Sequence, residues 1–512
     1  MSTLFVYGKY LIPDAGTTIP SGAVFVRDGK VEEIGQYKDL IQKFKPDILL
    51  GDSEALVTPG LVNAHGHGRG ISDFQRGAID DTLEVWKFRR YPPISAYWDT
   101  LWQCVLLLES GVTAVMHNHT PVKPLSAVEE MEEMLNAYKR SGLRLAFAPA
   151  LSYVNTFVYG EQEAFLSTLS TEDRKLAEQM MQHSRLFTPG KYFDTVDTLT
   201  RSHDSNFIRI HHGPMAPQWI EEEVLVEIEQ RARKAGKMLF THVQQTPQQY
   251  LYGLKTYGKT LIAWMEGKGI LGPHVSLGHC VWITEEDIQV LARTRCNVTH
   301  HPSCNLRVRN GISPLWDLHA AGVSVGLGMD DKEFGDDRDF IEEMRMASKL
   351  HRVVDSVPGS PCLGSRDVFR MATEGGAQCI GWGDTLGKIE VGKPADLVVL
   401  DYSRMTEPFT YSEHDPVEVL LQRGRKSHVR HVVVEGEVIL KNGIVTKIDK
   451  GEVLAKLKES IPGDYTEQFQ QSQKNLSSLK QSISRWFAER ERELDPYLRD
   501  PFYRMNNRNT KL

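Results

Sequence analysis

VSLGHCVWITEEDIQVLARTRCNVTHHPSCNLRVRNGISPLWDLHAAGVSVGLGMDD, residues 275–331, is the stretch that decides the fold class. Three short apolar runs, at 275–279, 297–300 and 323–330, are separated by segments with the spacing of amphipathic helices. Apolar runs that alternate so little with polar residues indicate strands covered on both faces. The stretch therefore predicts parallel strands joined by helices.

The same alternation of apolar runs and helical segments extends toward the N-terminus. Five earlier runs, each followed by a helical pattern, are LVNAH (61–65), VTAVMH (112–117), LRLAFAP (143–149), FIRIHH (207–212) and KMLFTH (237–242). Eight apolar strands alternating with helices predict an α/β protein with a (β/α)8 TIM barrel over residues 59–384.

The two ends of the chain have a different pattern. Short strands with tight turns occupy residues 1–58, as in AVFVRDGKVEEIG, and residues 385–450, as in HVRHVVVEGEVILKNGIV. We expect these two segments to form one composite β-sandwich domain. Residues 451–512 predict a helical C-terminal extension, because apolar residues recur there at helical spacing. The helix either packs on its own chain or forms a subunit-contact arm.

Composition excludes several classes of function. The 512 residues include 60 Lys and Arg against 67 Asp and Glu, a net charge of −7, which is not the footprint of a nucleic-acid binder. No apolar run approaches the roughly 18 residues of a membrane span, and the N-terminus lacks the pattern of a signal peptide. Six cysteines without a C-x-x-C pair indicate reduced thiols. We expect a cytoplasmic protein with a small-molecule substrate, no membrane partner, and a homo-oligomeric state (dimer or tetramer).

Ionisable side chains gather where the predicted strands end. The active sites of TIM barrels lie at the C-terminal ends of their strands. Residues two apart on a strand share a face, so both imidazoles of the first run's His-Gly-His can aim at one point. The strand-end residues are His65, His67, His242, His279, His300 and Asp330. Imidazoles with a carboxylate suit Zn(II) or Fe(II), and an open coordination position lets the metal lower the pKa of a bound water.

These stretches resemble the amidohydrolase superfamily, in the branch of cytosine, guanine and S-adenosylhomocysteine deaminases and triazine hydrolases. The matching stretches are VTPGLVNAHGHG, RGAIDDTLEVW, LGHCVWITEEDI, THHPSCNLRVRNGISPLWDLHAAGVSVGLGMDD, DFIEEMRMA and LGKIEVGKPADLVVLD. They follow the family order from about residue 20 to 445. The resemblance is specific for the fold and the metal centre, and much less specific for the substrate.

The resemblance implies a role for each matching residue. The ligands of one divalent metal ion, with Zn²⁺ favoured over Fe²⁺, would be His65, His67, His242 and Asp330. His279 would orient the reactive water or the developing oxyanion, and Asp330 would also accept the proton of that water. The stretch FIRIHHGPM contains no lysine, so the carboxylated lysine of two-metal members is absent and one metal is expected.

The chain departs from the family pattern at three places. The strand-5 motif, usually His-x-x-Glu, ends here in Gln245, an amide that cannot transfer a proton at neutral pH. Met215 stands where a polar histidine is usual, and His117 and His119 stand where an acidic residue is common. These two histidines either replace the lost proton transfer or are ordinary loop residues, and we favour the second interpretation.

Other residues of the matching motifs are candidates for the substrate pocket. We expect His300 and Asn305 to line it, with Met215, His117, Arg76 and Trp86, although Asn305 could instead cap a turn, and Arg76 and Trp86 could only pack the loop. Cys304 occupies the family's serine position. His301 is predicted to be structural, while Asp331 either holds an imidazole or is a solvated loop carboxylate.

The sequence thus predicts a metal-dependent hydrolase that cleaves a non-peptide C–N bond at an sp² carbon of an amidine-, urea- or amide-like molecule or an N-heterocycle. Its catalytic residues would be His279, Asp330 and Gln245. Two alternatives stay open. One is hydrolytic release of chloride or thiol from a related heterocycle, and the other is a non-catalytic scaffold, against which the intact ligand set argues.

Overall fold

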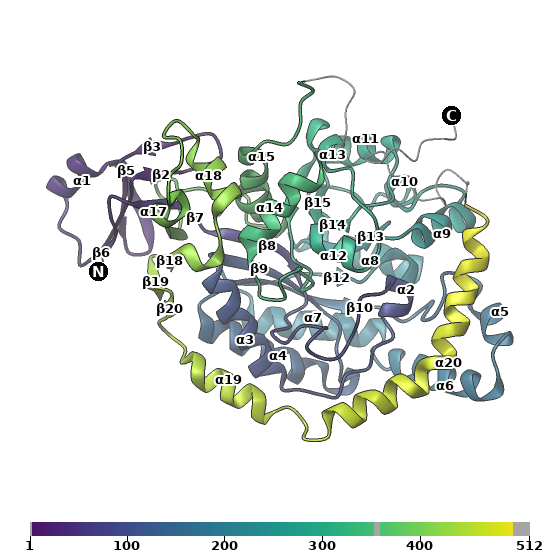
Figure 1. The fold of residues 1–512 in the computed structure, drawn as a ribbon. Helices are drawn as coiled ribbons and strands as arrows, with labels where there is room; N and C mark the ends of the chain where they lie inside the picture. The colour runs from purple at the N-terminus through teal and green to yellow at the C-terminus, as the bar shows by residue number, and fades with distance from the viewer. Residues whose placement is uncertain (1–2, 353–358, 495–512) are drawn as a thin grey trace.

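A computed structural model describes residues 3–352 and 359–494 of the chain, and the last part of the predicted C-terminal extension lies outside them. Its centre is a curled parallel sheet covered by helices (Figure 1). The eight strands of this barrel are β8 (Leu61–Gly66), β9 (Val112–His119), β10 (Arg144–Leu151), β11 (Ile208–Ile210), β13 (Leu239–Val243), β14 (Val275–His279), β15 (Asn297–His300) and β16 (Ser324–Leu327). The predicted fold class is confirmed.

Two parallel sheets make up the barrel: a five-stranded sheet with the order β11-β10-β9-β8, in which β12 (Gly213–Pro214) also pairs with β10, and a four-stranded sheet with the order β13-β14-β15-β16. The two sheets meet at two seams, and at one of them a parallel bridge joins His212 to Leu239. At the other seam the backbone N–H of Asp330 donates to the carbonyl of His65 over 3.1 Å. The first and last strands of the barrel therefore meet at the place where the sequence predicts the metal ligands.

Helices surround the barrel because each carries one apolar face. In α11 a capping box links Thr284 and Asp287 at the N-terminus, and α4 is capped at its C-terminus by Gly142, whose φ of 76° is left-handed. The helices of this layer are α3 (Ala96–Glu109), α4 (Ala127–Ser141), α5 (Gln162–Ser167), α6 (Thr171–Ser184), α7 (Pro189–His203), α8 (Glu222–Lys234), α9 (Pro247–Tyr257), α10 (Leu261–Gly267), α11 (Glu285–Thr294), α12 (Pro302–Arg307), α13 (Leu315–Ala320), α14 (Phe340–Leu350), α15 (Ser365–Arg370) and α16 (Gly376–Cys379).

Strands from both chain ends pair beside the barrel. One sheet has the order β5-β4-β1-β6, and the other has the order β20-β19-β18-β17-β7-β2-β3, in which β7 from the N-terminal part pairs antiparallel with β17 from the C-terminal part. These strands are β1 (Thr3–Tyr7), β2 (Tyr10–Leu11), β3 (Ile19–Pro20), β4 (Gly22–Arg27), β5 (Lys30–Gln36), β6 (Ile48–Gly51), β7 (Ala55–Pro59), β17 (Leu397–Asp401), β18 (Val429–Val434), β19 (Glu437–Lys441) and β20 (Ile444–Val445). The division of the chain into domains stays a prediction.

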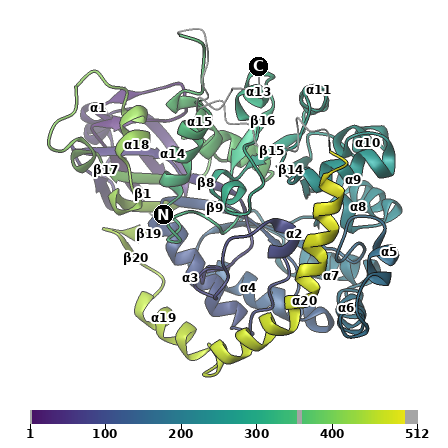
Figure 2. The same cartoon turned by 45° about the vertical axis from the view of Figure 1, so that its right-hand side comes forward.

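The C-terminal segment forms two helices, α19 (Lys450–Glu459) and α20 (Tyr465–Glu491), which wrap around one side of the barrel (Figure 2). The apolar face of α20 packs on the chain's own aromatic and aliphatic side chains. This cluster contains Leu476, Leu479, Ile483, Trp486 and Phe487 of α20 with Phe88, Phe157, Phe165 and Met180. Of the two interpretations of this helix, the structure therefore shows packing on its own chain. Among residues 3–352 and 359–494 no helix has the length and apolarity that a membrane span requires.

Candidate metal centre

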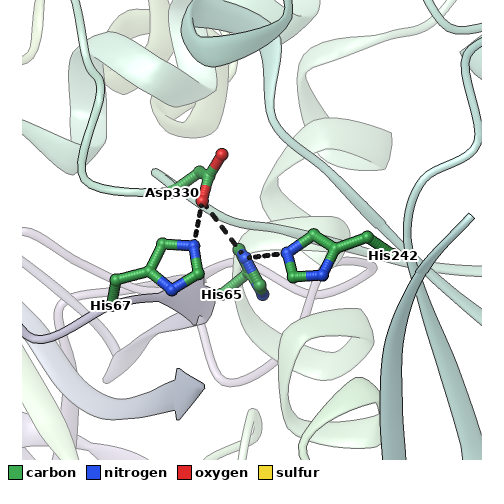
Figure 3. Close-up of side chains that lie close together, drawn as sticks. All are labelled: His65, His67, His242 and Asp330. Atoms are coloured by element: carbon green, nitrogen blue, oxygen red, sulfur yellow. Dashed lines mark hydrogen bonds and ion pairs between the residues drawn. The ribbon is translucent and has the colours of Figure 1, made fainter. Parts of the chain in front are cut away.

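Three imidazoles and one carboxylate converge at the C-terminal ends of β8, β13 and β16 (Figure 3). Nε2 of His65 and Nε2 of His67 lie 3.2 and 2.8 Å from Oδ1 of Asp330. Nε2 of His242 lies 3.1 Å from Nε2 of His65. Ligand bonds of about 2.0 Å in a tetrahedral site put donor atoms about 3.3 Å apart. Three of the donor–donor distances are thus close to this spacing, and all four donor atoms lie within 4.8 Å of one another.

Backbone carbonyls orient two of the imidazoles. Nδ1 of His67 lies 2.8 Å from the carbonyl oxygen of Asn118, and Nδ1 of His242 lies 2.7 Å from that of Met215. A carbonyl can only accept, so each Nδ1 carries the proton and each Nε2 presents a lone pair to the centre. Burial lowers the pKa of His65 and holds that of His242 well below its ordinary value, which keeps both rings neutral. The donor set therefore fits a cation.

Asp330 is kept as a carboxylate by its surroundings. Burial alone would raise its pKa, but the neighbouring Lys332 and the surrounding imidazoles hold the pKa well below the usual range. Nζ of Lys332 donates to the backbone carbonyl of Asp330 over 2.9 Å and lies 3.5 Å from Oδ2. This lysine is buried, and its ammonium lies 4.5 Å from the ring centroid of Trp86.

His279 stands beside the four donors with its Nε2 free. Nδ1 of His279 donates to Oδ1 of Asn305 over 2.8 Å, and Asn310 donates to the same oxygen. Nε2 is fully buried, lies 4.0 Å from Oδ2 of Asp330, and has no hydrogen-bond partner among the described residues. Burial lowers the pKa of His279 to about 4, so the ring is neutral at pH 7. Asn305 therefore positions His279.

Asp331 holds the backbone that carries the first two ligands. Its Oδ2 accepts from the backbone N–H groups of His67 and Arg69 over 2.9 and 3.0 Å, and its Oδ1 accepts from Nε2 of Gln103 over 2.8 Å. The residue is buried, so it is not a solvated loop carboxylate. It also contacts no ligand imidazole directly. Asp331 thus holds the backbone at the His-Gly-His motif in place through hydrogen bonds.

Gln245 follows the strand-5 ligand and is buried, and its backbone N–H donates to Oε1 of Gln249 over 2.8 Å. The next residue, Thr246, donates its hydroxyl to Oε1 of Glu84 over 2.6 Å. Burial raises the pKa of Glu84. Glu84, a buried acid outside the strand-5 motif, therefore contacts the residue that follows Gln245 in the chain.

Met215, Arg76 and Trp86 have structural contacts that bear on their expected roles. Met215 is half-buried and orients His242 through its carbonyl. The guanidinium of Arg76 pairs with Asp99, and its Nε donates to the carbonyl of Ile71, which fixes the loop after β8. Trp86 has the cation of Lys332 near its ring. Their contact with substrate stays a prediction.

Two expected pocket residues, His117 and His300, are directed away from the cluster. Nδ1 of His117 lies 3.3 Å from the hydroxyl of Tyr138, and Nε2 of His300 lies 2.9 Å from Nε2 of His351. Alternation along a strand places both side chains on the face opposite to that of their inward-facing neighbours, and their contact with substrate stays a prediction. The neighbouring side chains that do line the hollow inside the barrel are Met116 and Asn118 on β9 and Thr299 on β15. His119, the last residue of β9, places Nε2 2.8 Å from Oε1 of Glu130, and the interpretation of it as an ordinary residue stays a prediction.

The sequence analysis predicted a structural role for His301, without its place beside the metal centre, and did not single out Lys332. His301 continues the inward phase of Thr299, and its ring stacks on that of His65 at 4.6 Å and places Nδ1 3.2 Å from Nδ1 of His279. Counting the alternation one residue past β15 would have found it. Nothing in the sequence pattern marks Lys332, because its position depends on the path of the loop after β16.

The fold and the cluster define a metal-binding (β/α)8 hydrolase. The model of the amidohydrolase family matches residues 56–439, and the chain belongs to that family. Among curated relatives, the 5'-deoxyadenosine deaminase of Methanosarcina acetivorans is 28% identical over 464 residues, covering 89% of this chain and 96% of the relative. A 5-methylthioadenosine/S-adenosylhomocysteine deaminase of Syntrophobacter fumaroxidans is 27% identical over 464 residues, with the same two shares.

Solved structures share the fold at lower identity. An adenosine deaminase from Xanthomonas campestris with bound zinc has a TM-score of 0.74 and 22% identity, covering 92% of this chain and 99% of that one. The atrazine chlorohydrolase of Arthrobacter aurescens complexed with zinc has a TM-score of 0.74 and 20% identity, with shares of 90% and 100%. The family membership confirms the prediction of a hydrolase acting on C–N bonds other than peptide bonds, with a divalent metal.

Proposed function

We propose that this chain is a zinc-dependent aminohydrolase that removes an amino group from an amidine-type carbon of an N-heterocycle. The observation that carries the proposal is the convergence of His65, His67, His242 and Asp330 beside the free Nε2 of His279. A zinc ion held there would activate water and polarise the carbon under attack. The names of the curated relatives support an adenosine-type nucleoside as the first substrate class to assay.

The residues of this chain supply the proton transfers. Oδ2 of Asp330 faces away from the other ligands and can accept the proton of the attacking water. The neutral His279 can accept a hydrogen bond at Nε2 and, once protonated, donate to the developing oxyanion, because Asn305 fixes its ring. Gln245 can bind the substrate through its amide but cannot protonate a leaving group.

A second candidate function is release of an anionic group such as chloride or a thiolate. Two features together favour it. Gln245 is neutral, and the buried ammonium of Lys332 lies 3.5 Å from Oδ2 of Asp330. An anionic leaving group needs no proton, and a nearby cation stabilises it. We place this second because the curated relatives are deaminases.

One assay tests both functions. The purified protein, loaded with zinc, is incubated with a panel of aminopurine nucleosides, aminotriazines and their chloro and thiomethyl analogues, and ammonia, chloride and thiol release are measured. Ammonia release that is lost in Asp330→Asn supports the proposal. Chloride or thiol release alone favours the second candidate. Bound zinc without turnover of any class contradicts both, and absence of bound zinc under non-chelating conditions indicates the scaffold. Sedimentation measurements test the expected homo-oligomer.

A further inference from the structure

Cys304, at the family's serine position, contacts Asp330 of the metal centre. It is in α12, it is fully buried, and its Sγ donates to Oδ2 of Asp330 over 2.7 Å. Oδ1 of the same carboxylate faces His65 and His67. Asp330 therefore offers one oxygen to the predicted zinc ligands and the other to a thiol.

A third donor completes a group on this side. Sγ of Cys304, an oxygen of Asp330 and a ring nitrogen of His279 all lie within 4.8 Å of one another. Nε2 of His279 is 4.0 Å from Oδ2 of Asp330, is fully buried, and has no hydrogen-bond partner in the described parts of the chain. A sulfur, an imidazole and a carboxylate form a set that suits a soft or borderline divalent cation.

We infer that these three residues form a second, thiophilic metal site that holds an inhibitory cation such as Cd²⁺ or excess Zn²⁺. The Sγ–metal bond forms as the thiol releases its proton to solvent, and Asp330 then bridges the two ions through its two oxygens. The second cation occupies Nε2 of His279. The inhibition, though not the binding, rests on the proposed function, in which that nitrogen accepts a hydrogen bond from water.

Lys332 sets the order in which the two sites fill. Its ammonium lies 3.5 Å from Oδ2 of Asp330, where it repels a cation bound to that oxygen. The first site has three imidazoles and a carboxylate oxygen, whereas the second has one imidazole, one thiolate and the shared carboxylate. The second ion therefore binds more weakly than the first and appears only after the first site is filled.

The test is a titration of the zinc-loaded enzyme with Cd²⁺. Cys362 is exposed and would bind cadmium on its own, so every protein carries Cys362→Ser. Sulfur-to-cadmium charge-transfer absorbance in the ultraviolet reports the thiolate, and elemental analysis counts bound zinc and cadmium. Cys304→Ser keeps a hydrogen-bond donor to Asp330. Cys379→Ser is the matched control because Cys379 is equally buried and its Sγ donates to the backbone carbonyl of Val298.

We expect one cadmium with a charge-transfer band beside one retained zinc, and a loss of at least about tenfold in cadmium affinity, with loss of the band, in Cys304→Ser. Cys379→Ser should leave both readouts unchanged, and Lys332→Met should tighten cadmium binding. A band that persists in Cys304→Ser, or zinc loss in step with cadmium uptake, overturns the second site. Cadmium binding as expected in a protein inactive on every substrate would leave the site standing and contradict the proposed function.

Discussion

Asp331 offers the sharpest test of how the metal centre is held together. Its carboxylate accepts from the backbone N–H groups of His67 and Arg69 and from the amide of Gln103, and the side chain is only 3% exposed. In Asp331→Ala these three donors lose their partner in a buried place. An unpaired buried donor costs about 1–3 kcal/mol, so the free energy of unfolding should fall by about 3 kcal/mol or more.

Asp331→Ala should weaken zinc binding more than a substitution far from the metal centre that lowers the free energy of unfolding by the same amount. The segment that loses its bonds carries His67, and loss of a residue that orients a ligand typically weakens metal affinity by about 10–100-fold. Asp331→Asn should do much less, since the amide oxygen can still accept from both backbone groups and the amide of Gln103 can turn to accept. We expect a loss of less than about tenfold for this variant.

Competition with a chromophoric chelator measures zinc affinity, and thermal unfolding of the metal-free protein measures stability. Asp384→Asn, at an exposed carboxylate away from the cluster, is the control and should match the wild type. Zinc affinity of Asp331→Ala within twofold of the wild type would refute the reasoning, as would equal losses in the Ala and Asn variants.

Three further outcomes follow from particular contacts. Gln245→Glu should raise ammonia release from substrates with a poor leaving group by about 10²-fold if the proton donor is the missing element, and steady-state assays that find no gain would show that another group supplies it. His300→Gln should keep zinc affinity near that of the wild type because its ring contacts His351, whereas His301→Gln should weaken it, and chelator competition compares the two. Burial lowers the pKa of His212 to about 4 against an ordinary 6.5, so the folded state binds a proton at this ring less readily than the unfolded state does. The free energy of unfolding should therefore fall as the pH drops from 6.5 toward 4, by up to about 3 kcal/mol. Denaturant unfolding at pH 7 and 5 checks this, with a shallower pH dependence expected in His212→Gln.

The fold was predictable because it depends on a repeated pattern. Eight apolar runs with little alternation can only be buried on both faces, and that requirement indicates a barrel whatever the loops do. The pairing of β7 with β17 was foreseen only as a likeness of pattern between the two chain ends. The choice between the two arrangements of α20 could not be made, since an apolar helix face does not reveal which surface covers it.

The site was predictable where a residue's place in a strand fixed its direction. His65, His67 and His242 converge because they lie in the inward phase near the C-terminal ends of their strands, whereas His117 and His300 lie in the outward phase and contact Tyr138 and His351. The resemblance to the family does not give these directions, because it matches residues by motif and not by the direction of the side chain. Lys332 and the bonds of Asp331 depend on the path of a loop, which periodicity does not describe.

The charge of the centre distinguishes this chain from one that follows the family pattern more closely. Gln245 stands where the family pattern has a glutamate that would carry a negative charge when ionised, and the buried Lys332 lies 3.5 Å from Oδ2 of Asp330. Both features make the surroundings of Asp330 more positive than a site with the glutamate and without the lysine. A site of this kind stabilises negative charge that develops on the substrate, because an ammonium in a low-dielectric place needs no rearrangement when that charge forms. Under the proposed function, Lys332 would support the electrophilic side of the reaction while Gln245 leaves protonation of the leaving group to another residue, which predicts a preference for substrates whose leaving group departs without a proton or carries its own acidic neighbour.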